Sequence, residues 1–292
     1  MKQPVLLGIF AHPDDESFGP GGTLARYAAE GFALHVCTLT DGAAGTADPD
    51  CWDCLEGYAD LAARRLDELR CAVQILGGQL HWLGYRDSGM AGNAANDHPD
   101  ALINRPLADV AGRLTRLIRE LRPAIVVTHD DTGNYFHPDH IYTHRATVTA
   151  FHAAGDPTCY PEQLADGLEP YQPAGLYAYV IPRAYIRYFV WLARLSGQDP
   201  AHFGRNRDID LTRIGKPADQ IHARVRVRPY LKTKQQASAC HGSQGGGGGL
   251  STRAGSTLRD RILFWLRRWF INWESFQQLY PEPTGRHHAL TP

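Results

Sequence analysis

The chain has 292 residues, 43% of them hydrophobic, and a formal net charge of −1. A chain of this length can bury a substantial core without disulfide crosslinks. The near-neutral charge argues against a nucleic-acid-binding protein, and the absence of a transmembrane-length apolar run argues against an integral membrane segment. Six scattered cysteines and a start without a signal-peptide pattern predict a reducing, cytoplasmic location.

The predicted strands and helices alternate along the first two thirds of the chain. Apolar runs predict strands at 5–10, 34–39, 80–83, 124–128 and 176–181. Apolar residues at helical spacing predict helices at 24–30, 57–76, 107–121 and 141–154. Strands separated by helices form right-handed βαβ units. The sequence therefore predicts an α/β fold with a Rossmann-like, mostly parallel sheet and helices on both faces.

The pattern weakens after the fourth helix. We therefore expect a Rossmann-like core over 1–155 and an irregular C-terminal part over 156–292, integrated into one domain and completing the pocket. Within this part, 185–195 is either a helix packed on the core or a lip of the pocket. The run Gly245–Gly249 is either a flexible connector or a lid over the site.

Tryptophans mark the closing stretch, residues 258–279. Trp265, Trp269 and Trp273 are spaced four residues apart, which predicts a terminal helix with one tryptophan stripe. Such a helix docks on the core or forms a subunit interface, with a membrane-surface helix as the less favoured alternative. A homo-oligomer is therefore one of the expectations.

A dense cluster of charge follows the first predicted strand, in the sequence Ala11-His12-Pro13-Asp14-Asp15-Glu16. Open α/β sheets bind their ligands at the carboxyl ends of the strands. Neighbouring carboxylates repel one another unless a cation holds them. A histidine and a carboxylate three residues apart, such as His12 and Asp15, can both reach one divalent metal ion.

A second pair of histidines follows the strand predicted at 124–128. The loop there contains His137-Pro138-Asp139-His140 and leads into a predicted helix. Two histidines and one carboxylate with open coordination positions suit catalytic zinc, and equally a non-haem iron(II). The two motifs together predict a metal site, with Zn²⁺ as the expected ion and Fe²⁺ as the alternative.

The stretch Gly19-Pro20-Gly21-Gly22-Thr23 supports a different interpretation of the first motif. A strand, a glycine turn and a helix open many dinucleotide-binding folds. Here, however, the carboxylates of residues 14–16 lie where a pyrophosphate needs backbone amides and positive potential. A nucleotide-binding oxidoreductase is thus one alternative, and a non-catalytic sugar- or metal-binding module is another.

The two motifs together resemble the paired signature of the LmbE-like, or PIG-L-type, zinc-dependent N-acetylglucosaminyl deacetylases. The likeness covers most of the chain, and Phe136 stands where the family often has glycine, which we expect to reshape the rim of the site. Four further stretches fit the mycothiol-pathway deacetylase and amidase branch: Arg65–Leu69, Tyr85–Met90, Gly133–His140 and Lys234–Gln244.

The resemblance implies a division of labour among the charged residues. It makes His12, Asp15 and His140 the metal ligands. Asp14 is then the general base that takes a proton from the metal-activated water, because the ligating carboxylate of Asp15 shares its lone pair with the metal.

The second motif is implied to stabilise the transition state. His137, oriented by Asp139 and protonated, would stabilise the tetrahedral oxyanion or protonate the leaving amine, and Tyr135 would add a hydrogen bond to the same oxygen. By the same resemblance, the substrate-binding residues are Arg65, Asp87 and His241.

These assignments predict one reaction and its substrate class. The expected activity is hydrolysis of the N-acetyl group of an N-acetylglucosamine-type small glycoconjugate. A thiol S-conjugate amidase on the same scaffold is the alternative within the family.

Overall fold

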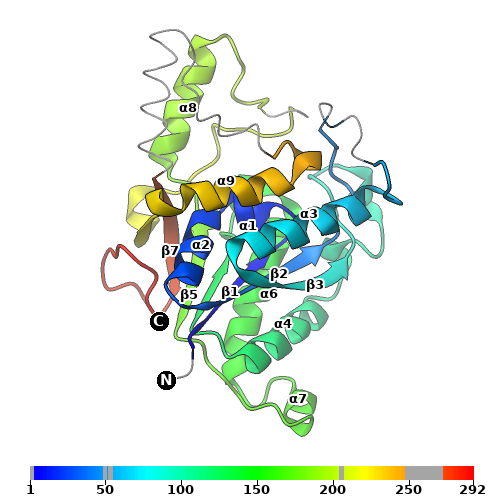
Figure 1. Ribbon diagram of the computed structural model, residues 1–292, viewed down its shortest axis with the longest axis vertical. Helices are drawn as coiled ribbons and strands as arrows, with labels where there is room; N and C mark the ends of the chain where they lie inside the picture. Colours follow the sequence, from blue (N-terminus) through cyan, green and yellow to red (C-terminus); the bar gives the residue numbers. More distant parts are fainter. Residues whose placement is uncertain (1–2, 49–50, 52–54, 204–206, 247–271) are drawn as a thin grey trace. The chain divides into compact units, whose positions relative to one another are not determined.

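The computed structural model describes residues 3–48, 51, 55–203, 207–246 and 272–292 (Figure 1). The chain groups into two compact units. Unit 1 comprises Met1–Asp87 and Val225–Glu274, and unit 2 comprises Ser88–Arg224 and Ser275–Pro292. Each unit combines an early and a late stretch of sequence. The division predicted after residue 155 stays a prediction.

Unit 1 contains a parallel arrangement of three strands. β1 (Val5–Phe10) pairs with β2 (Ala33–Thr40), and β2 pairs with β3 (Gly78–Tyr85). Nearly every side chain of β1 and β2 is buried, as expected for parallel strands covered on both faces. The helices of this unit are α1 (Asp15–Phe18), α2 (Gly21–Ala29), α3 (Leu61–Leu76) and α9 (Leu231–Cys240).

The ends of α3 follow from its flanking residues. The Asp60 side chain accepts a hydrogen bond from the Ala63 N–H at 2.8 Å, which makes Asp60 the N-cap. Gly77 ends the helix with φ of 80°, a left-handed conformation that glycine adopts without strain. The helix therefore starts four residues later than the predicted bound at residue 57.

A disulfide joins two helices of unit 1. Cys71 of α3 and Cys240 of α9 are bonded, with their Cα atoms 5.9 Å apart. The sequence predicts a core that does not need disulfides, in a reducing location, but this pair is bonded. Spacing could not reveal it, because the two cysteines are 169 residues apart and α9 was not predicted. Figure 1 shows α9 running alongside α3.

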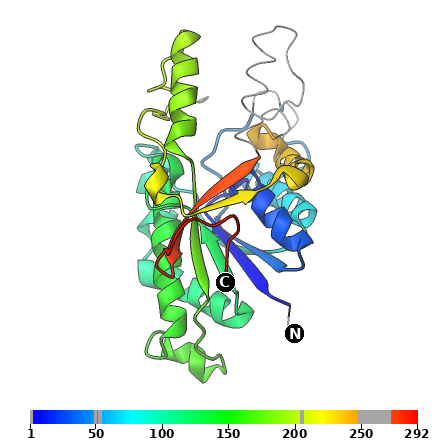
Figure 2. The ribbon, with the colours of Figure 1, turned by 90° about the vertical axis from the view of Figure 1, so that its left-hand side faces the viewer.

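Unit 2 contains both parallel and antiparallel pairing. β4 (Ile125–Thr128) pairs in parallel with β5 (Gly175–Val180), and β5 pairs antiparallel with β7 (Trp273–Tyr280). Two helices, α7 and α8, lie at opposite ends of this unit (Figure 1 and Figure 2). The helices are α4 (Leu107–Leu121), α5 (Gly133–Phe136), α6 (Pro138–Gly155), α7 (Pro161–Ala165) and α8 (Arg183–Leu195).

The predicted fold class is confirmed. Seven strands lie within the described residues, the seventh being β6 (Ala223–Arg226), and the strand pairs formed among β1–β5 within each unit are parallel. The predicted helix at 107–121 matches α4 at both ends. At 185–195, where a helix was one of two alternatives, the structure has the helix α8.

The predicted terminal helix is wrong over its described part, because Trp273 begins strand β7. Phe276 of this strand is completely buried, with its ring 5.9 Å from that of Tyr179 on β5. Pairing with β5, about a hundred residues earlier, thus overrides the helical spacing of the tryptophans. Trp265 and Trp269 lie outside the described residues, as does most of the glycine run at 245–249.

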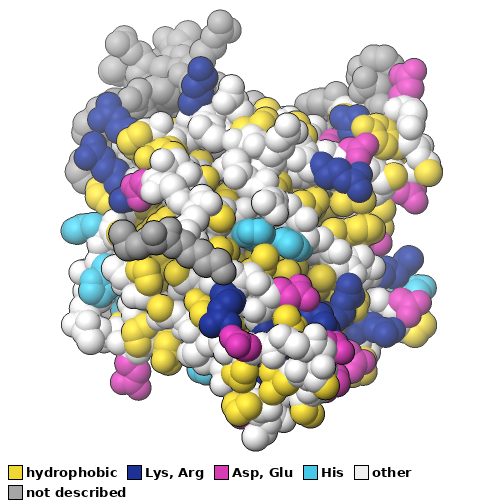
Figure 3. Space-filling model, turned by 60° about the horizontal axis from the view of Figure 1, so that its bottom comes forward, with side chains coloured by type: hydrophobic (Ala, Val, Ile, Leu, Met, Phe, Trp, Pro, Cys, Tyr) yellow, Lys and Arg dark blue, Asp and Glu magenta, His cyan; other side chains and the backbone are white. Residues whose placement is uncertain are grey.

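The surface agrees with a chain of near-zero net charge. Acidic and basic side chains occur close together on the face drawn in Figure 3. Within the described ranges, none of the helices combines the length and the apolar character that a membrane crossing needs.

Candidate metal centre

The first motif lies directly after β1, where His12 is 6% exposed. The His12 N–H donates to Asp15 Oδ2 at 2.8 Å, and the Nδ1 atom of His12 lies 3.5 Å from the same oxygen. On its other side, His12 Nε2 is 3.4 Å from Asp87 Oδ1. Asp87 is held in turn by the Ala44 N–H, at 3.1 Å. Two of the predicted metal ligands, His12 and Asp15, therefore lie together, with Asp87 beside them.

Asp14 has a backbone conformation that side chains rarely adopt, with φ of 129°. Its carboxylate accepts a hydrogen bond from Arg65 Nη2 at 3.0 Å. Burial raises the pKa of Asp14 to about 6, and the Arg65 guanidinium opposes part of this rise. Strained residues of this kind are concentrated at functional sites. A carboxyl with its pKa near neutrality suits a general base.

Arg65 is fixed by the loops around it. Its guanidinium donates to the Pro13 carbonyl at 2.6 Å and to the Gly42 carbonyl at 2.7 Å, in addition to Asp14. A Cβ atom on Gly42 would lie 2.6 Å from the guanidinium, so the position needs glycine. Arg65 is 3% exposed, and its contacts orient Asp14.

A buried ion pair lies next to the loop that contains Asp14. His241 Nε2 is 2.7 Å from Glu16 Oε1, and both side chains are inaccessible to solvent. Burial alone would lower the pKa of His241, but the Glu16 carboxylate outweighs it and raises that pKa above the usual value. The second oxygen of Glu16 accepts the Asp14 N–H at 3.0 Å. Through this hydrogen bond, the Glu16–His241 pair holds the backbone of Asp14 in place.

The segment after α9 is attached to α3 by side-chain hydrogen bonds. The Ser243 N–H and hydroxyl donate to the two carboxylate oxygens of Glu68 at 2.9 and 2.6 Å. These contacts and the Cys71–Cys240 disulfide hold His241 in place. The segment 231–244 therefore belongs to the motif's surroundings in unit 1, which sequence spacing alone did not indicate.

The three predicted substrate-binding residues are all buried, Arg65 and Asp87 to 97% and His241 completely. Their described contacts are with Asp14, His12 and Glu16, respectively. A direct sugar contact for these residues stays a prediction, whereas contacts to the first motif are observed.

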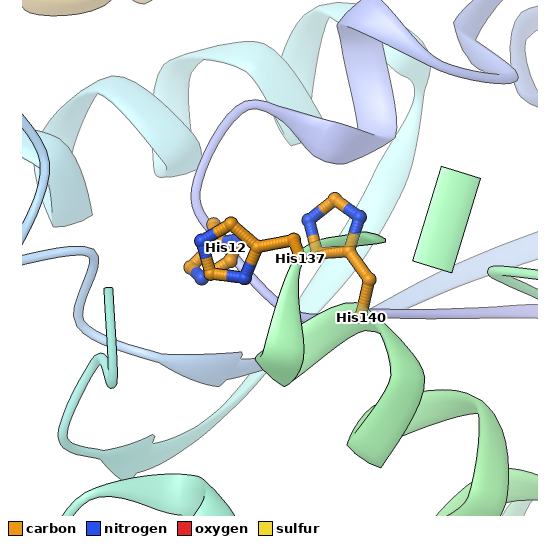
Figure 4. A group of neighbouring side chains, drawn as sticks. All are labelled: His12, His137 and His140. Atoms are coloured by element: carbon orange, nitrogen blue, oxygen red, sulfur yellow. The ribbon is translucent and has the colours of Figure 1, made fainter. Parts of the chain in front are cut away.

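The second motif lies in unit 2, at the start of α6. His137 is the N-cap of this helix, and its Nδ1 accepts the Asp139 N–H at 3.2 Å. Because Nδ1 accepts, the ring proton of the neutral imidazole lies on Nε2. The rings of His137 and His140 are 5.0 Å apart. Figure 4 shows both rings rising from the first turn of this helix, and His12 on its own segment.

Asp139 is completely buried, and its carboxylate accepts two hydrogen bonds from Ser88. The N–H donates at 2.9 Å and the hydroxyl at 2.5 Å. The described contact of Asp139 with His137 runs through its backbone N–H. Orientation of His137 by the Asp139 carboxylate stays a prediction.

His129 is a site residue that the sequence interpretation missed. Its ring stacks on that of His140 with centroids 3.8 Å apart, and it is 4% exposed. Asn134 donates to the Tyr179 carbonyl, so its Oδ1 accepts from His129 Nδ1 at 2.9 Å. His129 therefore carries its proton on Nδ1 and keeps the Nε2 lone pair. Its position at the end of β4 was the available signal.

Tyr135 lies on a strained turn. Asn134 and Phe136 on either side of it have positive φ angles of 62° and 67°. The Tyr135 ring is 5.0 Å from that of His140 and 5.9 Å from that of His137. Unit 2 therefore brings together the predicted residues Tyr135, His137 and His140, and adds His129.

Comparisons with known proteins agree on one family. The model of the PIG-L family, described as GlcNAc-PI de-N-acetylase, matches residues 7–151. The chain is 39% identical to a 1D-myo-inositol 2-acetamido-2-deoxy-alpha-D-glucopyranoside deacetylase from Thermomonospora curvata, over 82% of this chain and 80% of the relative. A deacetylase of the same name from Thermobifida fusca is 37% identical over 84% of each chain.

Solved structures share the fold. The N,N'-diacetylchitobiose deacetylase from Pyrococcus horikoshii superposes with a TM-score of 0.62 and 21% identity, over 95% of this chain and 84% of that one. The 4-carboxy-2-hydroxymuconate hydratase from Pseudomonas putida superposes with a TM-score of 0.58 and 18% identity, over 97% and 99%. Because the fold is common to a deacetylase and a hydratase, the activity has to be argued from the site.

Proposed function

Since this chain belongs to the PIG-L family of GlcNAc-PI de-N-acetylases, we propose that it removes the acetyl group from N-acetylglucosamine joined to a small polyol. The observation that carries the proposal is Asp14, whose carboxyl is 17% exposed, is held by Arg65 beside two potential metal ligands, and has its pKa raised to about 6. The relatives in Thermomonospora curvata and Thermobifida fusca are named as deacetylases of a myo-inositol glucosaminide, which makes that conjugate the first substrate to test.

The proposal includes a divalent metal ion, zinc first and iron(II) as the alternative, bound by His12, Asp15 and His140. The donor chemistry fits, because each of the two motifs offers imidazole nitrogens and a carboxylate oxygen, which are ligands that zinc and iron(II) accept. When bound, such an ion supplies Lewis acidity toward the amide carbonyl and lowers the pKa of a coordinated water.

Asp14 is proposed as the general base. It accepts a proton from the attacking water as the oxygen of that water bonds to the acetyl carbon. Arg65 and the Asp14 backbone contact with Glu16 hold the carboxylate in place for this transfer. When the C–N bond breaks, the same carboxyl can return the proton to the amine. Water and the amide are thereby converted to acetate and the free amino sugar.

His137 and Tyr135 are proposed to stabilise the oxyanion. Because His137 Nδ1 accepts the Asp139 N–H, a neutral ring carries its proton on Nε2, and we assign this N–H to the developing negative charge. The Tyr135 hydroxyl is a second donor from the same turn. A neutral His137 suffices for this role, which differs from the protonated histidine that the sequence interpretation favours.

The protein's setting and assembly are also part of the proposal. A cytoplasmic location suits a small glycoconjugate as substrate, and the net charge of −1 argues against a nucleic-acid partner. A homo-oligomer remains a proposal that a sedimentation measurement can test.

The test is release of primary amine and acetate by the purified protein. The substrates are N-acetylglucosamine, its myo-inositol conjugate and a malate conjugate, each assayed before chelation, after chelation and after restoring Zn²⁺ or Fe²⁺. We expect conjugate-dependent release that chelation abolishes and metal restores. Release from a thiol S-conjugate amide alone would favour the amidase. Stoichiometric metal binding without hydrolysis of any of these amides would contradict the proposal.

A further inference from the structure

An arm of unit 2 begins directly after β5. It consists of α8 with the described residues that follow it, 196–203 and 207–216, and neither motif includes any of it. Figure 2 shows α8, in yellow-green, standing beyond the ends of the unit 2 strands. This arm contacts the loop of the second motif, and the role proposed for it below rests on the proposed deacetylase function.

The arm is closed at its base by backbone hydrogen bonds. The Arg183 N–H donates to the Lys216 carbonyl at 2.8 Å, and the Lys216 N–H donates to the Ile181 carbonyl at 2.9 Å. Gly215, with φ of 102°, allows this approach, because a Cβ there would lie 2.8 Å from Arg183 Cα. Lys216 also forms an ion pair with Asp131, in the loop that follows β4. The base of the arm is therefore attached to the loop that carries the second motif.

An apolar cluster connects the arm to Tyr135. Ile186 of α8 and Leu211 and Ile214 of the returning chain are buried together, between 4 and 7% exposed. Tyr135 packs against this cluster, together with Ile181, Val190 and Ile209. The arm thus holds one side of the tyrosine ring whose other neighbours are His137 and His140.

Arg213 lies between the two buried residues of the returning chain, but its own side chain is exposed. Its guanidinium carbon lies 4.8 Å from the centre of the Phe136 ring. Stacking on an aromatic ring fixes the guanidinium plane and leaves its edge free to donate. Within the part of the chain that the structure describes, this guanidinium forms no hydrogen bond or ion pair with the protein.

We propose that Phe136 and Arg213 form the subsite for the group attached to C1 of the amino sugar. Phe136 directly precedes His137, so the stacked pair lies one residue from the proposed oxyanion donor. In the substrate, C1 neighbours C2, which carries the acetamido nitrogen. The group on C1 therefore lies beside the reacting amide. Arg213 is exposed, and its partner Phe136 is half-buried and adjacent in sequence to His137.

The ligand chemistry is a set of oxygen atoms that accept hydrogen bonds. The five N–H groups of a guanidinium form a planar fork that can donate to two oxygens at once. Neighbouring hydroxyls of a polyol such as inositol offer such a pair, and so does a carboxylate such as that of malate. The apolar face of a ring-shaped group can also rest on the Phe136 side chain.

The experiment compares Arg213→Met with the wild type on three substrates. Methionine keeps an unbranched apolar side chain, although a shorter one, and removes the donors. We expect KM for the preferred conjugate to rise at least tenfold with kcat nearly unchanged, and kcat/KM for free N-acetylglucosamine to stay within twofold. Arg194→Met, at an exposed arginine in the last turn of α8, is the matched control and should change neither value.

The comparison of substrates shows which kind of oxygen atom on the C1 group binds Arg213. A larger loss on the malate conjugate, partly restored in Arg213→Lys, indicates a carboxylate. A larger loss on the inositol conjugate, without rescue by lysine, indicates hydroxyls that need the fork. Equal losses on the conjugates and on free N-acetylglucosamine, or no loss on any substrate, would overturn the subsite.

A binding measurement separates this inference from the proposed reaction. Calorimetric titration with the deacetylated inositol and malate conjugates measures the subsite without turnover. At least tenfold weaker binding of one of them to Arg213→Met than to wild type would support the subsite even if no hydrolysis were found. Equal binding to both proteins would overturn it, even if the wild type were an active deacetylase.

Discussion

The two motifs are held in place by different means. In unit 1, the charged residues after β1 contact groups far away in sequence: Arg65 reaches Asp14 across 51 residues and His241 reaches Glu16 across 225. In unit 2, the two rings are held locally: that of His137 by the Asp139 N–H two residues on, and that of His129 by Asn134 five residues on. The Asp139 carboxylate is the exception, because Ser88, 51 residues earlier, donates to it.

The two motifs differ in the charge of the side chains that have to be held in place. Of the three successive carboxylates, Glu16 is completely buried, and the other two side chains are only 13–17% exposed. Such a group needs compensating cations, which a short loop cannot supply itself. Neutral imidazoles need only oriented hydrogen bonds, which a helix N-terminus and a tight turn supply locally. We therefore expect substitutions around the first motif to have the larger effects, and the following predictions test that order.

The largest effect is expected from Asp14→Asn. The amide cannot accept a proton from water, so kcat/KM should fall about 10²- to 10⁴-fold, the usual contribution of a general base. Metal content, measured by atomic absorption, should stay at the wild-type level. Asp100→Asn, at an exposed aspartate paired with Arg105, is the control and should keep full activity. Retained activity in Asp14→Asn would exclude Asp14 as the base.

The second effect is on stability. His241→Phe leaves the Glu16 carboxylate buried without its partner, which should lower the free energy of unfolding by about 3–5 kcal/mol. His202→Phe breaks a pair of similar length with Asp199 at an exposed position, and it should cause no measurable loss. Urea unfolding curves of the two variants provide the comparison. Equal urea concentrations at the midpoint of unfolding for the two variants would show that burial does not determine how much these ion pairs stabilise the protein.

The third effect concerns the disulfide. The double variant Cys71→Ser, Cys240→Ser removes a crosslink between α3 and α9 and should lower stability by about 2–5 kcal/mol. Cys159→Ser, at a free thiol in unit 2, is the control. Because the disulfide precedes His241 by one residue, activity should also fall. Loss of stability at unchanged kcat/KM would show that the 231–244 segment does not support Asp14.

A smaller effect is expected in unit 2. Asn134→Ala removes the hydrogen bonds to His129 and Tyr179 and should cost about 1–3 kcal/mol. Asn134→Gly removes the same bonds but relieves the positive φ of 62°, so it should cost less than alanine. Thermal unfolding of both variants measures the difference. A loss above that of His241→Phe would reverse the proposed order of the two motifs.

The smallest effect is on the pH dependence of stability. One histidine in unit 1 should lose its stabilising contribution as pH rises, and one in unit 2 should lose its contribution as pH falls. The raised pKa of His241 contributes stability that is present below pH about 6.5 and is lost as pH rises through the folded value. Burial lowers the pKa of His144 in unit 2, so its contribution is present above that pH and lost as pH falls. His241→Gln should flatten the alkaline side of the stability profile and His144→Gln the acidic side. The free energy of unfolding of both variants and the wild type is measured from pH 5 to 9. Profiles of the same shape for all three proteins would contradict the prediction.

The sequence by itself determined the elements and the chemistry that local patterns encode. Apolar runs located β1, β2 and β4, and helical spacing located α3 and α4, because burial of one face imposes these periods on neighbouring residues. The two motifs identified the metal ligands and the base to propose, since each combines its donors within a few residues.

Tertiary structure decided what depends on partners distant in sequence. The strand β7 replaces a predicted helix because β5 supplies its hydrogen bonds, and α9 is fixed by contacts with α3 and the Cys71–Cys240 bond. The same holds for Arg65 and His241, which become supports of Asp14 only when folding brings opposite charges together in a buried place. Such pairings leave no period in the sequence, because the free energy of a buried charge depends on which groups surround it in space.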